Sequence, residues 1–296
     1  VNMEQVYDVS VVVPLYYGEK YVKKIIDMIN KCKKNFQEKI EIIFVNDSPE
    51  EQIDINKICD VKYICNQNNF GIHKSRVIGL SAAKGKYILF LDQDDVIYEN
   101  FFNNQLKKIE NADAVVCNGY YRNNKCIYNM NEDVKFDKEC LFLKPNRIIS
   151  PGQVLIKKDK IPVEWCNNIM KNSGADDYLL WILMILKGCY IKVNYDCLYT
   201  HTEGKDNYSF KWGKMALSMM ELKKILATSG LLTRELSQRM SQAFDKTIYK
   251  YMQYKDIYDA LENMKKDGRS IADFFVQKKV SKAAVYGYGA LGQKVI

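Results

Sequence analysis

Three carboxylates stand directly after a short apolar run in this chain. The run is Tyr87-Ile-Leu-Phe-Leu91, and Asp92-Gln-Asp-Asp95 follows it at once. A run this short, with Gly85-Lys86 before it and polar residues after it, predicts a buried strand. Carboxylates crowded at a strand end repel one another and lose hydration, and a divalent cation with oxygen ligands relieves both costs. The pattern favours an Mg²⁺ or Mn²⁺ site over the simpler alternative, a bare acidic turn.

A second pair of carboxylates, Asp176 and Asp177, comes just before the apolar stretch Tyr178–Leu186. Acidic residues in the first turn of a helix interact favourably with the helix dipole and need no catalytic role. A carboxylate beside a bound substrate can also accept a proton as a general base. The residue types alone leave both interpretations open.

The elements that must position these side chains alternate along the first 120 residues. Strand-like runs are expected at 9–13, 40–45, 61–65, 87–91 and 113–117, and helical stretches at 19–35, 72–83 and 98–110. This alternation predicts an α/β fold with a doubly wound, mostly parallel sheet. Such sheets bind ligands at the carboxyl ends of their strands, where the acidic cluster of Asp92–Asp95 falls.

The rest of the chain suggests three parts. Residues 1–204 are expected to form the α/β domain, with an irregular, ligand-facing stretch at 118–175. Residues 205–270 have helical apolar spacing and are expected to form a helical extension. Residues 271–296 are expected to start a possible further α/β domain, because Gly287-x-Gly-x-x-Gly292 follows a strand-like run. No second strand follows these glycines within the sequence, so a complete dinucleotide site is not expected there.

Charge and composition exclude several classes of protein. Lys and Arg total 44 against 36 Asp and Glu, and residues 205–296 hold 17 of the basic and 9 of the acidic residues. The first 204 residues are therefore neutral, which argues against a nucleic-acid partner. The basic C-terminal third allows a peripheral contact with an anionic membrane or polymer, although a solvated basic helix face is the simpler explanation. Its helices are also candidates for a homo-oligomer contact.

Cysteine usage and the first residues favour the cytoplasm, with a possible peripheral location at the inner face of the membrane. The nine cysteines include no Cys-x-x-Cys pair, and there are only two histidines, so a zinc site is not expected. The N-terminal residues lack the basic start and apolar core of a signal peptide. No apolar run approaches the roughly 20 residues of a membrane span.

Several motifs in order resemble the family 2 inverting glycosyltransferases of the GT-A fold. The resemblance covers roughly residues 8–204. It rests on Val9-Ser-Val-Val-Val-Pro-Leu-Tyr16, Glu41-Ile-Ile-Phe-Val-Asn-Asp-Ser48, Asn69-Phe-Gly71 with Ser75 and Arg76, Gly85–Asp95, and Gly174-Ala-Asp-Asp-Tyr-Leu-Leu-Trp181.

The resemblance implies a metal-dependent enzyme that moves a sugar from a nucleotide-sugar, a UDP-sugar by preference, to a hydroxyl of a polysaccharide or glycoconjugate. The transferase would be of the hexosyl or N-acetylhexosaminyl type. Asp94 and Asp92 would bind Mn²⁺ or Mg²⁺, with Asp92 also near the ribose, and His201 is a candidate third ligand. The nucleotide would contact Pro14, Tyr16, Asp47, Asn69, Gly71 and Arg76, and the catalytic base would be Asp177, with Asp176 beside it.

Two departures from the family pattern affect these assignments. Asn46-Asp47 replaces an acidic pair, which leaves one carboxylate to contact the nucleobase. A single carboxylate favours a pyrimidine, because uracil and thymine carry an imide N–H that can donate to it. Ala175-Asp176 replaces the Glu that usually precedes the base, so the choice between Asp176 and Asp177 stays open. Trp165 and Trp181 are candidates for stacking on a sugar, although Trp181 is expected in the core.

Two other functions fit parts of the pattern. A catalytically silent module that binds sugar nucleotides or glycans would keep the fold, but the intact acidic residues speak against it. A sugar nucleotidyltransferase can share the sheet topology, yet Pro14-Leu-Tyr-Tyr-Gly18 stands where its Gly-rich, Arg-containing loop would be.

Overall fold

A computed structural model describes residues 7–34, 39–53, 55, 60–121, 123–143, 146–202, 211–270 and 273. Its centre is an eight-stranded sheet with the strand order β3-β2-β1-β4-β7-β6-β8-β5. The strands are β1 (Val9–Leu15), β2 (Ile40–Asn46), β3 (Val61–Cys65), β4 (Tyr87–Phe90), β5 (Val96–Ile97), β6 (Ala114–Tyr120), β7 (Val154–Lys157) and β8 (Ile191–Thr200).

The sheet is mostly parallel, as the alternating pattern predicts. Strand β1 pairs in parallel with β2 and β4, β2 with β3, and β6 with β8. Strand β7 is antiparallel to both of its neighbours, β4 and β6, and the two-residue β5 is antiparallel to β8. Strand β7 lies in the stretch that the sequence presents as irregular, because its four residues are too few to show a period.

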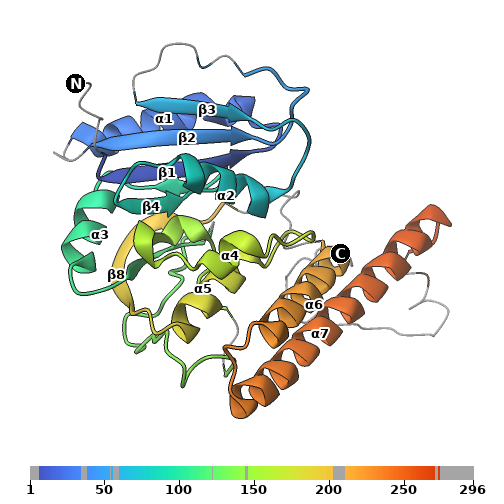
Figure 1. Ribbon diagram of the computed structural model, residues 1–296. Coiled ribbons are helices and arrows are strands. Elements are labelled where there is room, and N and C mark those ends of the chain that lie inside the picture. The colour runs from blue at the N-terminus through green and yellow to red at the C-terminus, as the bar shows by residue number, and fades with distance from the viewer. Residues whose placement is uncertain are drawn as a thin grey trace.

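Helices cover both faces of the sheet (Figure 1). Helices α1 (Glu19–Lys34) and α3 (Phe101–Ile109) pack on one face, around side chains such as Ile29 and Phe101. Helices α2 (Ile72–Ala82), α4 (Val163–Asn167) and α5 (Asp176–Leu186) pack on the other. Helix α5 is apolar on every side after its first turn, and nearly all of it is buried, so it is a core helix rather than a surface one.

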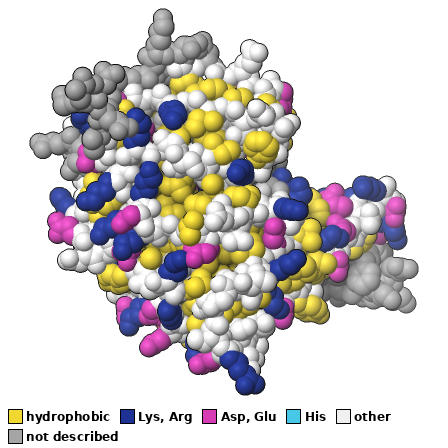
Figure 2. Space-filling model, viewed as in Figure 1, with side chains coloured by type: hydrophobic (Ala, Val, Ile, Leu, Met, Phe, Trp, Pro, Cys, Tyr) yellow, Lys and Arg dark blue, Asp and Glu magenta, His cyan; other side chains and the backbone are white. Residues whose placement is uncertain are grey.

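Two long helices extend the second layer beyond the sheet. Helices α6 (Trp212–Thr228) and α7 (Arg234–Lys266) pack side by side, and α6 also contacts α5 (Figure 1). The buried residues of α7 are Leu236, Met240, Phe244 and Ile248, all in its first half. Figure 2 shows Lys and Arg interspersed with Asp and Glu along these helices. Within the described residues, no helix is both long and apolar enough to cross a membrane.

The sequence-based domain boundaries stay predictions. The helical region after residue 211 is present as expected, but the terminal glycine-rich segment lies outside the described residues. The α/β fold class is confirmed.

Helix α2 lies so close to the sheet that Gly79 has no room for a side chain. A Cβ at this position would collide with a methyl group of Val12, which is fully buried in the central strand β1. Any larger residue must push α2 away from the sheet, and α2 carries Arg76.

We predict that Gly79→Ala lowers the free energy of unfolding by about 1–3 kcal/mol, because overpacking outweighs the helix propensity gained. Chemical denaturation measures this change. Gly213→Ala is the matched control, since a Cβ there meets only the flexible Lys255 side chain, at 3.0 Å. Equal effects of the two substitutions would contradict the tight contact.

Candidate active site

The parallel strands β2, β1 and β4 end at the same edge of the sheet, and their next residues form one site. Leu15 pairs with Asn46, so Tyr16 and Asp47 follow side by side. The pairing of β1 with β4 stops at Val12, where the backbone N–H of Leu91 donates to the Val12 carbonyl at 3.0 Å. The polar residues predicted at the strand ends are therefore neighbours in space.

Asp47 organises the turn that leads into α2. Its carboxylate accepts hydrogen bonds from the backbone N–H groups of Phe70 and Gly71 and from the side chain of Asn66, each at 2.8 Å. Gly71 has φ of 84°, a conformation that favours glycine. Asn69 is exposed on this turn and accepts from the Gly71 N–H at 3.1 Å.

The side chain of Asn46 explains one departure from the family pattern. Its amide donates to the carbonyl oxygens of Ser48 and Glu51, both at 3.0 Å. A carboxylate cannot donate these bonds. Asn46 is fully buried and therefore fixes the shape of the turn that carries Asp47.

The acidic loop, residues 92–95 after β4, holds the backbone of Tyr16 through the side chain of Gln93. Gln93 accepts from the Tyr16 N–H at 2.9 Å and donates to the Tyr16 carbonyl at 3.2 Å. The ring of Tyr16 is about half exposed (52%), so one face can meet a ligand. Pro14 is buried within β1, beyond the last residue that pairs with β4, and it shapes the strand end that Tyr16 follows.

Arg76 joins the two acidic clusters of the sequence. It is 3% exposed, and its guanidinium contacts Asp92 on one side and Asp176 on the other, each at 2.5 Å. Burial alone would lower the pKa of the guanidinium, but the carboxylates of Asp176 and Asp92 outweigh burial and raise it. Its Nε has no hydrogen-bond partner among the described residues.

The adjacent carboxylates Asp176 and Asp177 have pKa values shifted in opposite directions. Burial opposes ionisation of Asp176, but Arg76 holds its pKa below the ordinary value. Asp177 is half-buried and has no ion pair to Arg76. Burial, and next the charge of Asp176, raise the pKa of Asp177 to about 7. The two carboxylates thus have different protonation near neutral pH, with Asp176 ionised and Asp177 able to gain or lose a proton.

Asp95 is held in a buried hydrogen-bonded cluster. It accepts from the Ser150 hydroxyl at 2.6 Å, from the Tyr199 hydroxyl at 2.5 Å and from the Thr202 N–H at 3.3 Å. His201 is adjacent, with its Nδ1 3.2 Å from the Tyr199 hydroxyl and 3.6 Å from Asp95. Asp95 therefore positions the end of β8 and its His201.

Helix α6 holds the turn before the acidic pair. The Glu221 carboxylate accepts from the backbone N–H groups of Lys171 and Asn172, both at 2.8 Å. The Ser218 hydroxyl accepts from the Ala175 N–H at 3.0 Å. The C-terminal helices thus help to place the first turn of α5.

Comparison with known proteins identifies the family. The profile of glycosyl transferase family 2 matches residues 10–179, which is more than half of the chain and runs from β1 into the first turn of α5. The chain belongs to glycosyl transferase family 2. Its mostly parallel sheet with helices on both faces is a GT-A type of fold.

Named relatives agree with this family. Glycosyltransferase GlyG of Streptococcus pneumoniae is 33% identical over 123 residues, which is 39% of each chain. The minor teichoic acid biosynthesis protein GgaB of Bacillus subtilis is 40% identical over 106 residues, 34% of this chain and 12% of GgaB. The matched regions span less than half of the length of these relatives.

Crystal structures of Staphylococcus aureus TarS share the fold. Residues 1–349 of TarS superpose with a TM-score of 0.52 at 16% identity, covering 86% of this chain and 91% of the TarS chain. The complex of that TarS fragment with UDP-GlcNAc gives the same TM-score at 18% identity, covering 89% and 93%.

Within this family 2 glycosyltransferase, no three His, Cys, Asp or Glu side chains of the described residues form a ready-made metal site. The carboxylate oxygens of Asp92 and Asp94 nevertheless fit a divalent cation that keeps a substrate phosphate among its ligands. Asp94 is half-buried, and burial, then the charges of Asp95 and Asp92, raise its pKa to about 6. A cation relieves this repulsion.

Sequence reasoning missed the residues that support the site. Ser150, Tyr199, Ser218 and Glu221 act through hydrogen bonds across the fold, and no motif marks them. The structure brings Arg76, Asp92, Asp176 and Asp177 together. It buries Trp165 (0% exposed) and Trp181 (2%), so neither presents a face for stacking on a sugar.

The raised pKa of Asp177 predicts a pH-dependent gain of stability in Asp177→Asn. The folded pKa of about 7 exceeds the ordinary 3.8, so wild-type stability falls as pH rises from 3.8 to 7. Asn has no charge to bury. We expect a larger increase in melting temperature for Asp177→Asn at pH 8 than at pH 5.

Thermal unfolding at the two pH values measures this difference. Asp245→Asn is the control, since Asp245 is exposed and pairs with Lys223 on the surface. The same change in melting temperature for Asp177→Asn at both pH values would show that the Asp177 pKa is not raised.

Proposed function

We propose that this glycosyltransferase moves a sugar from a UDP-sugar to a hydroxyl of a polysaccharide or glycoconjugate acceptor, with inversion and with a divalent cation. The observation that carries the proposal is the division between Asp176 and Asp177. Arg76 keeps Asp176 ionised, and Asp177 next to it has a pKa of about 7, as a general base at neutral pH needs.

The proposed position of the nucleotide is over the ends of β1 and β2. The exposed ring of Tyr16 offers a face for a base, and the Asp47 carboxylate lies at the next strand end. Asp47 accepts three hydrogen bonds, and a carboxylate has about four acceptor sites, so one site is left for the imide N–H of uracil. Asn69 and Gly71 form the turn beside it. The TarS structures with UDP and UDP-GlcNAc support this choice of base.

The diphosphate is placed at Asp92, Asp94 and Arg76. A bound Mn²⁺ or Mg²⁺ supplies positive charge where the leaving diphosphate gains negative charge. Asp94 and Asp92 would hold the cation, with His201 as a further candidate ligand at the end of β8. Arg76, paired with Asp92, adds a fixed positive charge beside this position.

The acceptor hydroxyl attacks the anomeric carbon on the side away from the diphosphate, and the bond to the diphosphate breaks. Asp177 takes the proton of that hydroxyl as the new bond forms, which makes the oxygen a better nucleophile. Asp176 stays paired with Arg76, and its charge adds to the effect of burial in raising the pKa of Asp177.

We predict that Asp177→Asn lowers the transfer rate about 100-fold or more, because the base is lost. The dissociation constant for UDP should change little, since Asp177 is not among the proposed nucleotide contacts. In the wild type the rate should rise as pH increases through about 7, the pKa of Asp177, and then level off.

Product formation from UDP-sugars across pH 5–9, with calorimetric UDP titration, tests this expectation. Asp245→Asn serves again as the surface control. Near-normal turnover of Asp177→Asn, or a rate that falls between pH 6 and 8, would remove Asp177 from the role of base.

We predict that Asp94→Asn weakens Mn²⁺ binding in the presence of UDP at least tenfold, because one carboxylate ligand loses its charge. The paramagnetic broadening of UDP resonances by Mn²⁺ reports this binding without a turnover measurement. Asp159→Asn is the control, in a surface turn on the far end of the strands. Unchanged broadening with Asp94→Asn would exclude Asp94 as a ligand.

The C-terminal helices are proposed as the contact with a second copy or with a membrane surface. Exposed apolar side chains on α6 and α7 support such a contact, namely Leu217, Met220, Tyr249, Met252 and Ile257. The division into a transferase domain, residues 1–204, and a helical extension also stays a proposal, because α6 takes part in placing the catalytic turn.

A further inference from the structure

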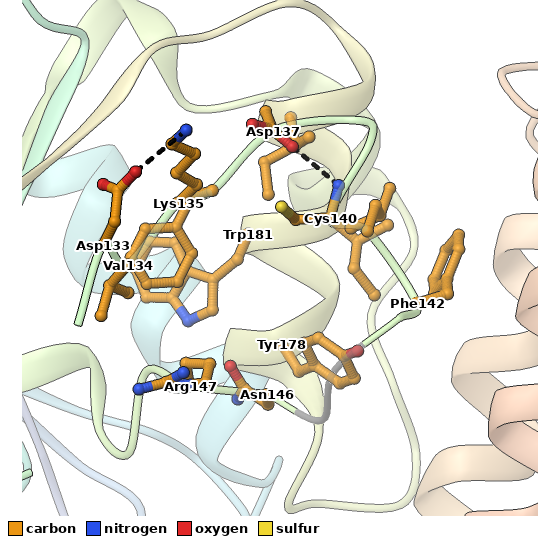
Figure 3. A pocket seen from close by; sticks show the side chains of 14 residues that line it. Asp133, Val134, Lys135, Asp137, Cys140, Phe142, Asn146, Arg147, Tyr178 and Trp181 are labelled. Atoms are coloured by element: carbon orange, nitrogen blue, oxygen red, sulfur yellow. Dashed lines mark hydrogen bonds and ion pairs between the residues drawn. The ribbon is translucent and has the colours of Figure 1, made fainter. Parts of the chain in front are cut away.

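A cavity of about 70 Å³ lies beside the helix that carries Asp177 (Figure 3). One wall is a face of α5 with Tyr178, Trp181 and Ile182. The other wall comes from residues 133–142 and 146–147, between β6 and β7, with Val134 and Arg147 among its lining residues. The cavity is separate from the nucleotide-binding residues proposed above, and it is largely apolar.

The indole of Trp181, a residue that lines this cavity, carries an unused hydrogen-bond donor. Trp181 is 2% exposed, and its Nε1 has no hydrogen-bond partner among the described residues. Figure 3 shows the nitrogen edge of the indole facing the side where Asn146 and Arg147 lie. The buried Trp165, by contrast, donates its indole N–H to the Asp176 carbonyl at 2.8 Å. An unpaired buried donor costs about 1–3 kcal/mol, so the Trp181 N–H calls for an acceptor.

Both cationic side chains that line the cavity are paired with carboxylates. Lys135 pairs with Asp133 at 3.0 Å, and Arg147 pairs with Glu132 at 2.5 Å. Asp137 accepts from the Cys140 N–H at 2.7 Å. The cavity therefore favours a neutral ligand group with one acceptor and an apolar remainder.

The size of the cavity limits that group further. A water molecule needs about 10–15 Å³ of such volume, so the cavity holds roughly five to seven water-sized atoms. An acetyl group with its linking atom meets this limit. Its carbonyl oxygen accepts the Trp181 N–H, and its methyl group packs against Ile182 and Val134.

Both walls of the cavity continue into the candidate active site. Tyr178 directly follows Asp177 on α5. From Arg147 the other wall leads to Ser150, whose hydroxyl donates to Asp95 at 2.6 Å. A ligand anchored here by a side group would extend along α5 toward the proposed base.

We propose that this cavity binds a short acyl group of the acceptor, either an N-acetyl amide or an O-acetyl ester. The acceptor role rests on the proposed transferase function, whereas the binding of the acyl group does not. The acyl group would select among acceptors, since an acceptor without it leaves the Trp181 N–H unpaired.

The indole N–H signals of the protein test the proposal directly. The sequence has three tryptophans, so a ¹⁵N-labelled protein gives three indole signals, which Trp181→Phe and Trp212→Phe assign. The whole chain, saturated with UDP, is titrated with methyl N-acetylglucosaminide, methyl 6-O-acetylglucoside and plain methyl glucoside. Trp212 packs on Tyr254 and Tyr258, away from the cavity, and is the internal control.

We expect an acetylated probe to shift the Trp181 signal and leave the Trp212 signal in place, and to bind about tenfold more tightly than methyl glucoside. A response to one probe alone identifies the amide or the ester, and a response to both identifies the acyl group itself. Trp181→Phe should remove the preference for the acetylated probe.

A Trp181 signal that ignores both acetylated probes would overturn the proposal, as would an unchanged acetyl preference in folded Trp181→Phe. The first readout needs no variant beyond signal assignment, so misfolding of Trp181→Phe does not obscure it. Sugar transfer without a shift of the Trp181 signal would contradict only the acyl-binding proposal. A shift of the Trp181 signal without any sugar transfer would contradict the proposed function and leave the cavity as a binding site.

Discussion

The buried contact of Arg76 with Asp92 and Asp176 is the interaction on which the site depends. It connects the loop after β4 with the first turn of α5, two segments far apart in the sequence. A guanidinium at 3% exposure is stable only while its carboxylate partners remain, since loss of one leaves a buried charge unpaired. The same contact keeps the pKa of Asp176 low. Arg76 therefore both joins two segments of the fold and controls the protonation of the acidic pair.

The sheet makes that contact possible by holding α2 at a fixed height. Gly79 allows α2 to approach Val12 closely, and Asp47 fixes the turn at Gly71 from which the helix starts. Arg76 therefore projects from a helix that is constrained at its beginning and along its length. Ligand-induced movement in this protein is expected in the acidic loop and in the segments around it rather than in α2.

Local patterns in the sequence predicted the parallel strands, the turns at their ends and the acidic clusters, because each depends on neighbouring residues. Strand β7 was not predicted, because four residues show no period. The roles of Tyr199 and Ser150 were not predicted, because their partner, Asp95, lies elsewhere in the chain. Trp181 was expected in the core and is there, but its unpaired N–H depends on what surrounds it. The two carboxylate partners of Arg76 likewise depend on tertiary packing, which a single sequence does not reveal.

The hydrogen bonds from the turn before α5 to Ser218 and Glu221 bear on how such proteins diversify. Lys171, Asn172 and Ala175 all donate to α6, so the helices that follow the shared fold are fastened to the most reactive part of the molecule. Exchanging these helices between members of the family would therefore alter more than an attached module. Evolution of a new C-terminal region in this lineage has to preserve, or rebuild, two acceptors at that interface.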